Sequence, residues 1–158
     1  MAIAFLGIGA NLGDREENIR KAMELLGQHE DIEVLTLSDR IETKPVGGPK
    51  QEKFLNAAAK IKTDLLPLEL LSQLKIVERR LGRAKAAELN GPRPIDLDIL
   101  FYDDVVITKG KTLAIPHPRL AERRFVLEPL SQIAPELVHP RLNKTVIELR
   151  EALKQASH

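Results

Sequence analysis

Residues Gly91-Pro92-Arg93-Pro94-Ile95-Asp96-Leu97-Asp98-Ile99-Leu100-Phe101 contain a strand pattern around which the architecture of the chain can be predicted. The second half of this stretch alternates apolar and polar residues, which predicts a β-strand with Leu97, Ile99 and Phe101 facing a core. The same period places Asp96 and Asp98 together on the opposite face, roughly 6–7 Å apart. Two carboxylates this close repel each other unless a cation lies between them, and magnesium prefers such oxygen ligands. Taken alone, an Asp-x-Asp pair is more commonly part of a solvated strand face than of a metal site. The choice between these two interpretations therefore depends on the rest of the chain.

The elements before this strand follow the order βαββαβ. The residue patterns predict strands over residues 3–9, 32–42 and 54–61, and helices that begin after Asp14 and at Pro67. This order is that of a ferredoxin-like α+β core, in which the helices pack on one face of a mainly antiparallel sheet.

Beyond this core we expect an additional hairpin and C-terminal helices. Asp103-Asp104 is expected to turn the chain into a hairpin over residues 105–107 and 113–115. Five prolines then predict a mostly irregular or short-helical stretch, and a capping-box pattern at Thr145 and Glu148 begins a last helix. No linker or repeat interrupts the chain, so residues 1–158 are expected to form a single domain.

Composition restricts the classes of function. The 158 residues carry a formal net charge of +1, so nothing global indicates a nucleic acid or an anionic membrane as partner. The absence of cysteine excludes disulfides and thiolate catalysis, and it fits a reducing compartment. The sequence has neither a signal-peptide pattern nor an apolar run long enough to span a membrane, so we expect a cytoplasmic protein.

A group of cations lies close to the aspartate pair in sequence. Arg79 and Arg80 fit the C-terminal end of the preceding helix, where positive charge is favoured. That explanation does not extend to Arg83, Lys85 and Arg93, which fall in a loop that contains glycine and proline. Cations on a loop beside two carboxylates indicate a lid that closes over phosphate and metal.

His117 lies in a rigid Pro-His-Pro segment that is followed by Arg123 and Arg124. This setting makes a phosphate contact about as plausible as a structural role. The remaining histidines have no such setting and are expected at the surface; they are His29, His139 and His158.

Gly7, Gly9 and Gly13 follow the first strand and precede the first helix. Their spacing is one residue too long for the dinucleotide-binding pattern, so we interpret them as turn residues around Asn11.

Phe54 and Asn56 share one face of the strand over residues 54–61. An aromatic ring beside an amide can bind a flat heterocycle, by stacking and by edge hydrogen bonds. The alternative is a second core, because a sheet can be covered on both faces, and the two residues alone favour that alternative.

Taken together, the motifs resemble those of the 6-hydroxymethyl-7,8-dihydropterin pyrophosphokinases of folate biosynthesis. The resemblance covers essentially the whole chain, and its motifs are Gly91-Pro92-Arg93-x-x-Asp96-Leu97-Asp98-Ile99, Gly9-Ala10-Asn11-Leu12-Gly13-Asp14, Thr43-x-Pro45-x-Gly47, Phe54-Leu55-Asn56-Ala57, and Pro116-His117 with Arg123-x-Phe125. It implies transfer of pyrophosphate from ATP to the hydroxymethyl oxygen of the pterin, by attack at the β-phosphorus, with release of AMP.

The resemblance also implies roles for individual residues. Asp96 and Asp98 would hold two magnesium ions, and Asp98 would either help to deprotonate the hydroxyl or serve only as a ligand. Arg83 and Arg93 would act on the phosphates as catalytic residues. The implied ATP site comprises Glu78, Arg83, Lys85, Arg93, Ile99, His117 and Arg123. The implied pterin site comprises Thr43, Pro45, Val46, Phe54, Asn56 and Phe125, with the two phenylalanines on either side of the ring.

Two loops, residues 44–53 and 83–94, would act as lids, and the enzyme is expected to be a monomer that acts on small molecules. Three departures from the family pattern are Ala10, where serine is usual, Asn90, where some members have an aromatic residue, and Phe54, which lacks the hydroxyl that a tyrosine would offer. Two rival classes are a nucleotidyltransferase, which also uses paired aspartates, and a ferredoxin-like RNA-binding module, which the 3% aromatic content disfavours.

Overall fold

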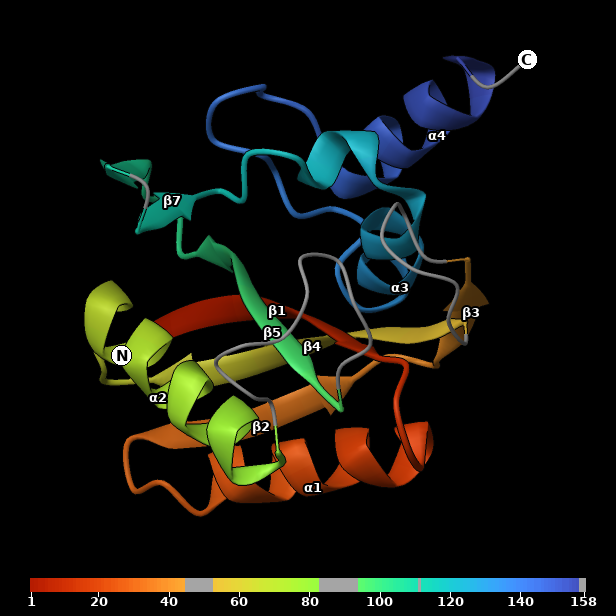
Figure 1. The fold of residues 1–158 in the computed structure, drawn as a ribbon. Coiled ribbons are helices and arrows are strands. Elements are labelled where there is room, and N and C mark those ends of the chain that lie inside the picture. Colours follow the sequence, from red (N-terminus) through yellow and green to blue (C-terminus); the bar gives the residue numbers. More distant parts are fainter. Residues whose placement is uncertain (45–52, 83–93, 111, 157–158) are drawn as a thin grey trace.

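Five strands of the described part of the chain form the main sheet. Four of them lie in the order β2 (Ile32–Leu37), β4 (Phe54–Thr63), β1 (Ala2–Ala10) and β5 (Asp96–Tyr102), with every neighbouring pair antiparallel. A computed structural model describes residues 1–44, 53–82, 94–110 and 112–156 (Figure 1). Its elements are β1 (Ala2–Ala10), α1 (Arg15–Gly27), β2 (Ile32–Leu37), β3 (Ile41–Thr43), β4 (Phe54–Thr63), α2 (Pro67–Arg80), β5 (Asp96–Tyr102), β6 (Ile107–Lys109), β7 (Leu113–Ile115), the 3-10 turn η1 (Leu120–Glu122), α3 (Arg124–Ile133) and α4 (Val146–Ala156). The strand order confirms the ferredoxin-like α+β prediction.

The two long N-terminal helices begin where the sequence predicts. Asp14 caps α1 by accepting a hydrogen bond from the backbone N–H of Glu17 at 3.1 Å. Pro67 occupies the first turn of α2, and Gly82, which follows this helix, has a φ of +96°. No helix in the described part of the chain is both long and apolar enough to cross a bilayer.

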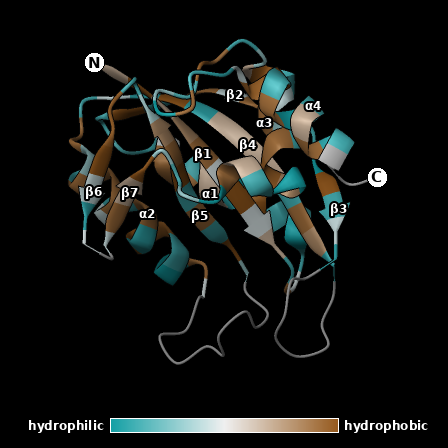
Figure 2. Ribbon diagram, turned by 90° about the horizontal axis from the view of Figure 1, so that it is seen from above, coloured by the Kyte–Doolittle hydropathy of each residue, from teal (hydrophilic) through white to brown (hydrophobic). Residues whose placement is uncertain are grey.

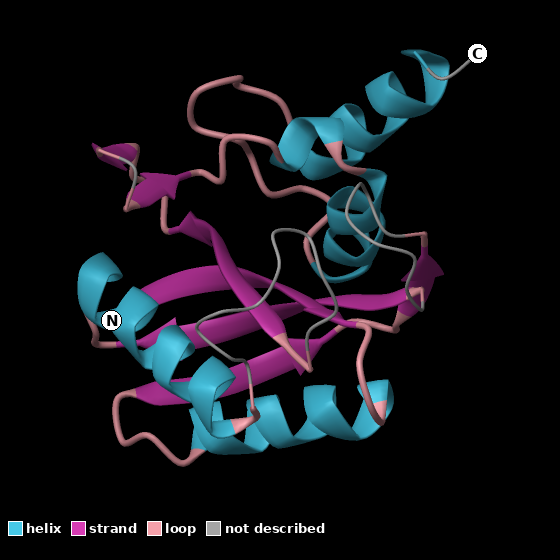
Figure 3. Cartoon of the chain, in the orientation of Figure 1, coloured by secondary structure: helices cyan, strands magenta, loops and turns pink. Residues whose placement is uncertain are grey.

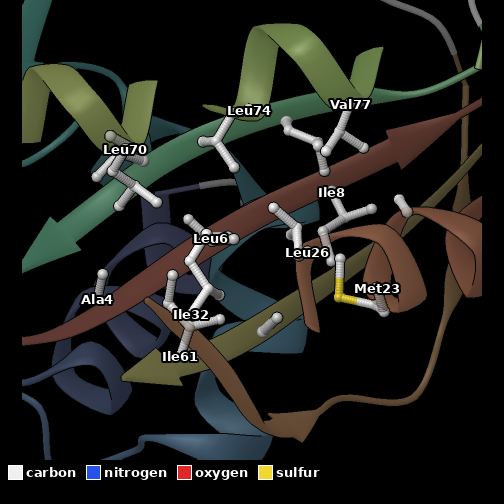
Figure 4. Packing of buried hydrophobic residues seen from close by; sticks show 14 of the residues in the cluster. Ala4, Leu6, Ile8, Met23, Leu26, Ile32, Ile61, Leu70, Leu74 and Val77 are labelled. Atoms are coloured by element: carbon white, nitrogen blue, oxygen red, sulfur yellow. The ribbon is translucent and has the colours of Figure 1, made fainter. Parts of the chain in front are cut away.

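Helices α1 and α2 cover one face of the sheet and form the first core (Figure 4). Leu6 and Ile8 from β1 pack there against Met23 and Leu26 of α1 and Leu74 of α2. Figure 2 shows both brown and teal residues on α2, as expected of an amphipathic helix that buries one side.

Helices α3 and α4 cover part of the opposite face and form a second core (Figure 3). Its members include Phe5 of β1, Ala58 of β4, Leu127 of α3 and Leu149 of α4. The expectation that helices pack on one face is therefore correct only for α1 and α2, because the C-terminal helices, absent from the βαββαβ core, bury the other face.

Strand β5, at the edge of the main sheet, contains a β-bulge that the sequence does not reveal. Leu6 pairs with Ile99 whereas Phe5 pairs with Phe101, so Leu100 is an extra residue on β5. Since a shift of one residue moves a side chain to the other face, Phe101 joins the second core instead of the first. The prediction that Phe101 shares a core with Leu97 and Ile99 is wrong for this reason.

Residues 32–42 form two strands rather than one. The chain leaves β2 at Ser38, whose hydroxyl accepts a hydrogen bond from the N–H of Ala58 at 2.8 Å, and then enters β3. The N–H of Asp39, between β2 and β3, donates to the Gln132 side chain at 2.9 Å. This hydrogen bond connects the chain between the two strands to α3, one of the helices of the second core.

The C-terminal half is more regular than its prolines suggest. The hairpin pairs residues 107–109 with 113–115. Helix α3 is ten residues long and contains Pro129 in its interior. The capping box is confirmed, because Thr145 and Glu148 exchange hydrogen bonds at the start of α4.

The assignment of His139 to the surface is wrong. His139 is buried, its ring packs edge-on against Phe101 at 5.6 Å, and its Nδ1 accepts hydrogen bonds from the following turn. His29 is half-buried, and its Nδ1 accepts from the N–H of Asp31 at 3.0 Å. His158 lies outside the described residues.

Candidate active site

A cleft of about 470 Å³ opens on the same sheet face as the second core, over the part of that face that α3 and α4 leave uncovered. Its strand residues come from β1, β3, β4 and β5, and the opposite wall comes from the segment between β7 and α3 together with the first turn of α3. The residues that line it are Gly7, Ile8, Gly9, Thr43, Lys44, Phe54, Asn56, Ala57, Asp96, Asp98, Leu100, His117, Arg119, Glu122, Arg123, Arg124, Phe125 and Val126.

Two glycines of β1 form the floor of this cleft. Gly9 pairs with Asn56 of β4 on one side and with Asp96 of β5 on the other. A Cβ on Gly9 would lie 3.3 Å from Oδ1 of Asn56 and 3.5 Å from a ring carbon of Phe54. The prediction that these glycines form a turn around Asn11 is wrong for Gly7 and Gly9, which lie within β1. Because they have no side chain there, the cleft extends down to the backbone of this strand.

One end of the cleft, which we call the amide half, consists of Thr43, Phe54, Asn56 and Phe125. Nδ2 of Asn56 donates to Oγ1 of Thr43 at 2.6 Å, which fixes the orientation of a buried amide. The sheet face is thus shared, because Ala58 on the same face belongs to the second core whereas Phe54 and Asn56 face the cleft. The interpretation as a second core is therefore correct for Ala58, and the binding of a heterocycle by Phe54 and Asn56 stays a prediction.

The other end, which we call the acidic half, contains Asp96 and Asp98. Burial, together with repulsion from Asp96 and Glu78, raises the pKa of Asp98 to about 6, and the nearby cations Lys75 and Arg123 oppose this rise. A carboxylate pair with this much unfavourable electrostatics is a site that favours binding of a cation.

Glu78 of α2 supports the acidic half from behind β5. Its Oε2 accepts a hydrogen bond from the N–H of Leu97 at 2.8 Å, between the two aspartates, and its Oε1 lies 3.5 Å from Nζ of Lys75. Glu78 is buried, and it satisfies the N–H of Leu97 at the edge of β5.

His117 and Arg123 face the acidic half from the opposite wall. Burial and the adjacent charges of Arg123 and Arg119 lower the pKa of His117, against a smaller opposite effect of Asp96. Nδ1 of His117 accepts from the N–H of Arg119 at 3.2 Å, which leaves Nε2 as the donor of the neutral ring. The guanidinium of Arg123 lies 5.5 Å from the centre of the Phe125 ring, so this residue borders both halves.

The described cleft brings together eight of the residues implied for the substrates and metal: Thr43, Phe54, Asn56, Asp96, Asp98, His117, Arg123 and Phe125. Glu78 and Ile99 do not line it, because Glu78 lies behind β5 and Ile99 faces the first core. The predictions for Pro45, Val46, Arg83, Lys85 and Arg93 concern residues outside the described ranges.

The prediction did not assign Lys44, Arg119 and Arg124 to the site, although all three line the cleft. The only available signal was the density of arginines after His117. Which of those arginines face the cleft depends on where η1 ends and α3 begins.

The donor set of the acidic half fits magnesium. Magnesium is commonly bound through one or two carboxylates and completes its shell with water and substrate phosphate. Among the described residues no group of three or more His, Asp or Glu side chains could hold a metal by itself. Asp96 and Asp98 therefore fit an ion that arrives with a phosphate rather than one enclosed by protein ligands.

The fold and the cleft define a ferredoxin-like α+β domain with the acidic and basic groups that phosphoryl-transfer enzymes use. Comparison with known proteins makes this specific, since the model of the 7,8-dihydro-6-hydroxymethylpterin-pyrophosphokinase family matches residues 5–135. The chain belongs to this family, and its enzymatic class is that of an ATP-dependent pyrophosphokinase.

Individual relatives agree with this assignment. The chain is 44% identical over 150 residues to the 2-amino-4-hydroxy-6-hydroxymethyldihydropteridine pyrophosphokinase of Aquifex aeolicus, covering 95% of this chain and 91% of that protein. It is 42% identical over 151 residues to the folic acid synthesis protein fol1 of Schizosaccharomyces pombe, where it covers 96% of this chain but only 20% of the relative.

Among solved structures, an HPPK-DHPS protein crystallised with substrates matches with a TM-score of 0.77 at 16% identity. The match covers 99% of this chain and 44% of that chain, so this structure supports the fold alone. The chain thus spans less than half of the Schizosaccharomyces protein and of the HPPK-DHPS chain, and nearly all of the Aquifex protein.

Proposed function

We propose that the chain transfers the pyrophosphoryl group of ATP to the hydroxymethyl oxygen of 6-hydroxymethyl-7,8-dihydropterin, in folate biosynthesis. The observation that carries this proposal is the row Asn56–Gly9–Asp96 across three neighbouring strands. Since adjacent strands lie about 4.8 Å apart, the amide half and the acidic half are separated by about 10 Å on one face. That spacing allows a flat pterin in one half to present its hydroxymethyl group to phosphates in the other.

The amide half would bind the pterin. Asn56, held by Thr43, offers an amide edge to the polar edge of the heterocycle, while Phe54 and Phe125 would lie on either side of the ring. The backbone at Pro45 and Val46, together with Thr43, completes the proposed pterin site.

The acidic half would hold the phosphates and two magnesium ions through Asp96 and Asp98. When bound, the ions neutralise phosphate charge and favour ionisation of the attacking hydroxyl. His117 would donate from Nε2 to a phosphate oxygen, and Arg123 would supply positive charge beside it. Arg83, Lys85 and Arg93 are proposed as further phosphate contacts, with Arg83 and Arg93 catalytic, and Glu78 and Ile99 would lie near the nucleotide.

The proposed reaction is attack of the hydroxymethyl oxygen on the β-phosphorus of ATP. The new O–P bond forms as the bond between the β-phosphorus and the bridging oxygen to the α-phosphate breaks, AMP leaves, and the hydroxyl proton is released. Asp98 would either accept that proton or act only as a metal ligand, and the pH profile of kcat distinguishes the two roles.

We also propose that the protein acts as a monomer in the cytoplasm on small-molecule substrates, without a nucleic-acid or membrane partner. The single-domain organisation of residues 1–158 is part of this proposal.

Product analysis tests the proposed function. The purified protein should convert ATP and the dihydropterin to AMP and a pyrophosphorylated pterin in equal amounts. Release of inorganic pyrophosphate with a nucleotidylated pterin would instead show attack at the α-phosphorus, as a nucleotidyltransferase makes, and would overturn the proposal.

A further inference from the structure

Arg15, the first residue of α1, joins that helix to two strands that carry residues of the amide half. Its Nη1 donates to the backbone oxygen of Lys53 at 2.8 Å, and its Nη2 pairs with Oε1 of Glu42 at 2.7 Å. The Arg15 side chain is 28% exposed and that of Glu42 is 50% exposed, so solvent screens the ion pair in part, and the hydrogen bond to Lys53 adds a second anchor.

The two partners of Arg15 are direct chain neighbours of residues that line the cleft. Glu42 precedes Thr43, and the Lys53 oxygen belongs to the peptide group that leads into Phe54. Thr43 and Phe54 are themselves paired in the β3–β4 ladder. One guanidinium therefore contacts β3 through Glu42 and the residue directly before β4, Lys53, at the point where this ladder reaches the cleft.

A second ion pair of opposite polarity lies next to the first. Arg40, just before β3, pairs with Glu16 of α1 at 2.8 Å, whereas Arg15 of α1 pairs with Glu42 of β3. A displacement of β3 along α1 would separate both pairs and bring like charges together. The first turn of α1 thus specifies one position for the short strand that carries Thr43.

We propose that Arg15 is a positioning residue of the amide half: it holds Thr43 and Phe54 in the arrangement that binds the pterin, without touching the pterin itself. This inference rests on the proposed function, because it concerns the pterin site of that reaction. Arginine is suited to the task because its planar fork reaches two acceptors at once, whereas lysine is a single point charge.

The chain offers a matched control on the same helix. Arg20 is exposed and pairs with Glu17 and Glu24 within α1, so it loses two ion pairs on mutation but contacts neither β3 nor β4. A general effect of removing helix charge would appear equally in Arg15→Ala and Arg20→Ala, whereas an effect on the amide half would appear only in Arg15→Ala.

Steady-state kinetics of the whole protein test the proposal. Arg15→Ala should raise KM for the dihydropterin about tenfold while leaving KM for ATP and kcat within about twofold, and Arg15→Lys should recover part of the loss. Arg20→Ala should match the wild type in all three constants. Equal pterin KM values for Arg15→Ala and Arg20→Ala would overturn the inference.

Amide hydrogen exchange without any substrate separates this inference from the proposed function. In Arg15→Ala, the amides of residues 41–43 and 54–56 should exchange at least about fivefold faster than in Arg20→Ala, with the first core unchanged. If the wild type did not turn over the pterin, the proposed function would fail, yet faster exchange would still support the positioning role. Unchanged exchange at these residues would refute it.

Discussion

Replacement of Asp98 by asparagine should stabilise the metal-free protein while removing its activity. The pKa of Asp98 rises from 3.8 to about 6 because the carboxyl is buried and lies near Asp96 and Glu78. Each pKa unit corresponds to about 1.4 kcal/mol, so the ionised carboxylate lowers the free energy of unfolding by about 3 kcal/mol. Asparagine has nearly the same shape and carries no charge.

The sign of the pH dependence follows from the raised pKa of Asp98. The unfolded chain releases this proton at lower pH than the folded protein does, so wild-type stability falls between about pH 4 and pH 6 and stays low above that range. The advantage of Asp98→Asn should therefore be absent near pH 4 and complete, at about 3 kcal/mol, near pH 8.

Urea unfolding in the presence of a chelator measures this difference at both pH values. Asp104→Asn is the matched control, because Asp104 is exposed in the turn after β5, and its loss should change stability by less than about 0.5 kcal/mol. Magnesium with a non-hydrolysable ATP analogue should stabilise the wild type and have much less effect on Asp98→Asn. An asparagine variant that is no more stable than the wild type at pH 8, or that retains turnover, would refute this reasoning.

Two further changes test the floor and the support of the cleft. Gly9→Val should raise KM for the pterin about tenfold with KM for ATP little changed, because its Cβ would crowd Asn56; steady-state kinetics measure both. Gly27→Ala is the control, since its Cβ would meet nothing within 4 Å, and it should leave both constants unchanged. Glu78→Ala should cost about 1–3 kcal/mol in urea unfolding, because it leaves the N–H of Leu97 without its acceptor, whereas Glu78→Gln should preserve most of the stability.

Each of these expectations has a contrary outcome. An unchanged pterin KM in Gly9→Val would mean that the pterin does not lie over the floor of β1. Equal losses of stability in Glu78→Ala and Glu78→Gln would show that charge, rather than the hydrogen bond to Leu97, is what Glu78 contributes.

The elements of the fold could be predicted from the sequence, but the register of β5 could not. The alternation around Asp96 and Asp98 predicted a strand with both carboxylates on one face, and the order of strands and helices predicted the ferredoxin-like core. The bulge at Leu100 was not predictable, because residues 99–102 are all apolar or aromatic and fit either register.

The site was harder to predict from the sequence than the fold, because it too depends on contacts between residues far apart in the chain. Gly7 and Gly9 become the floor of a cleft only through pairing with β4 and β5, which are distant in sequence. Likewise, the buried ring of His139 packs against Phe101, and Phe101 belongs to the second core because of the bulge at Leu100. Local patterns cannot report such long-range contacts, whereas the motif resemblance named eight of the residues that line the cleft.

Calorimetric titration of the dihydropterin, with and without magnesium and a non-hydrolysable ATP analogue, tests most directly whether the two halves of the cleft are occupied together. The amide and acidic halves share one sheet face about 10 Å apart. One pterin should therefore bind per chain when the nucleotide site is saturated, with an affinity at least equal to that of the free protein. Competition, in which saturating nucleotide abolishes pterin binding, would contradict the account.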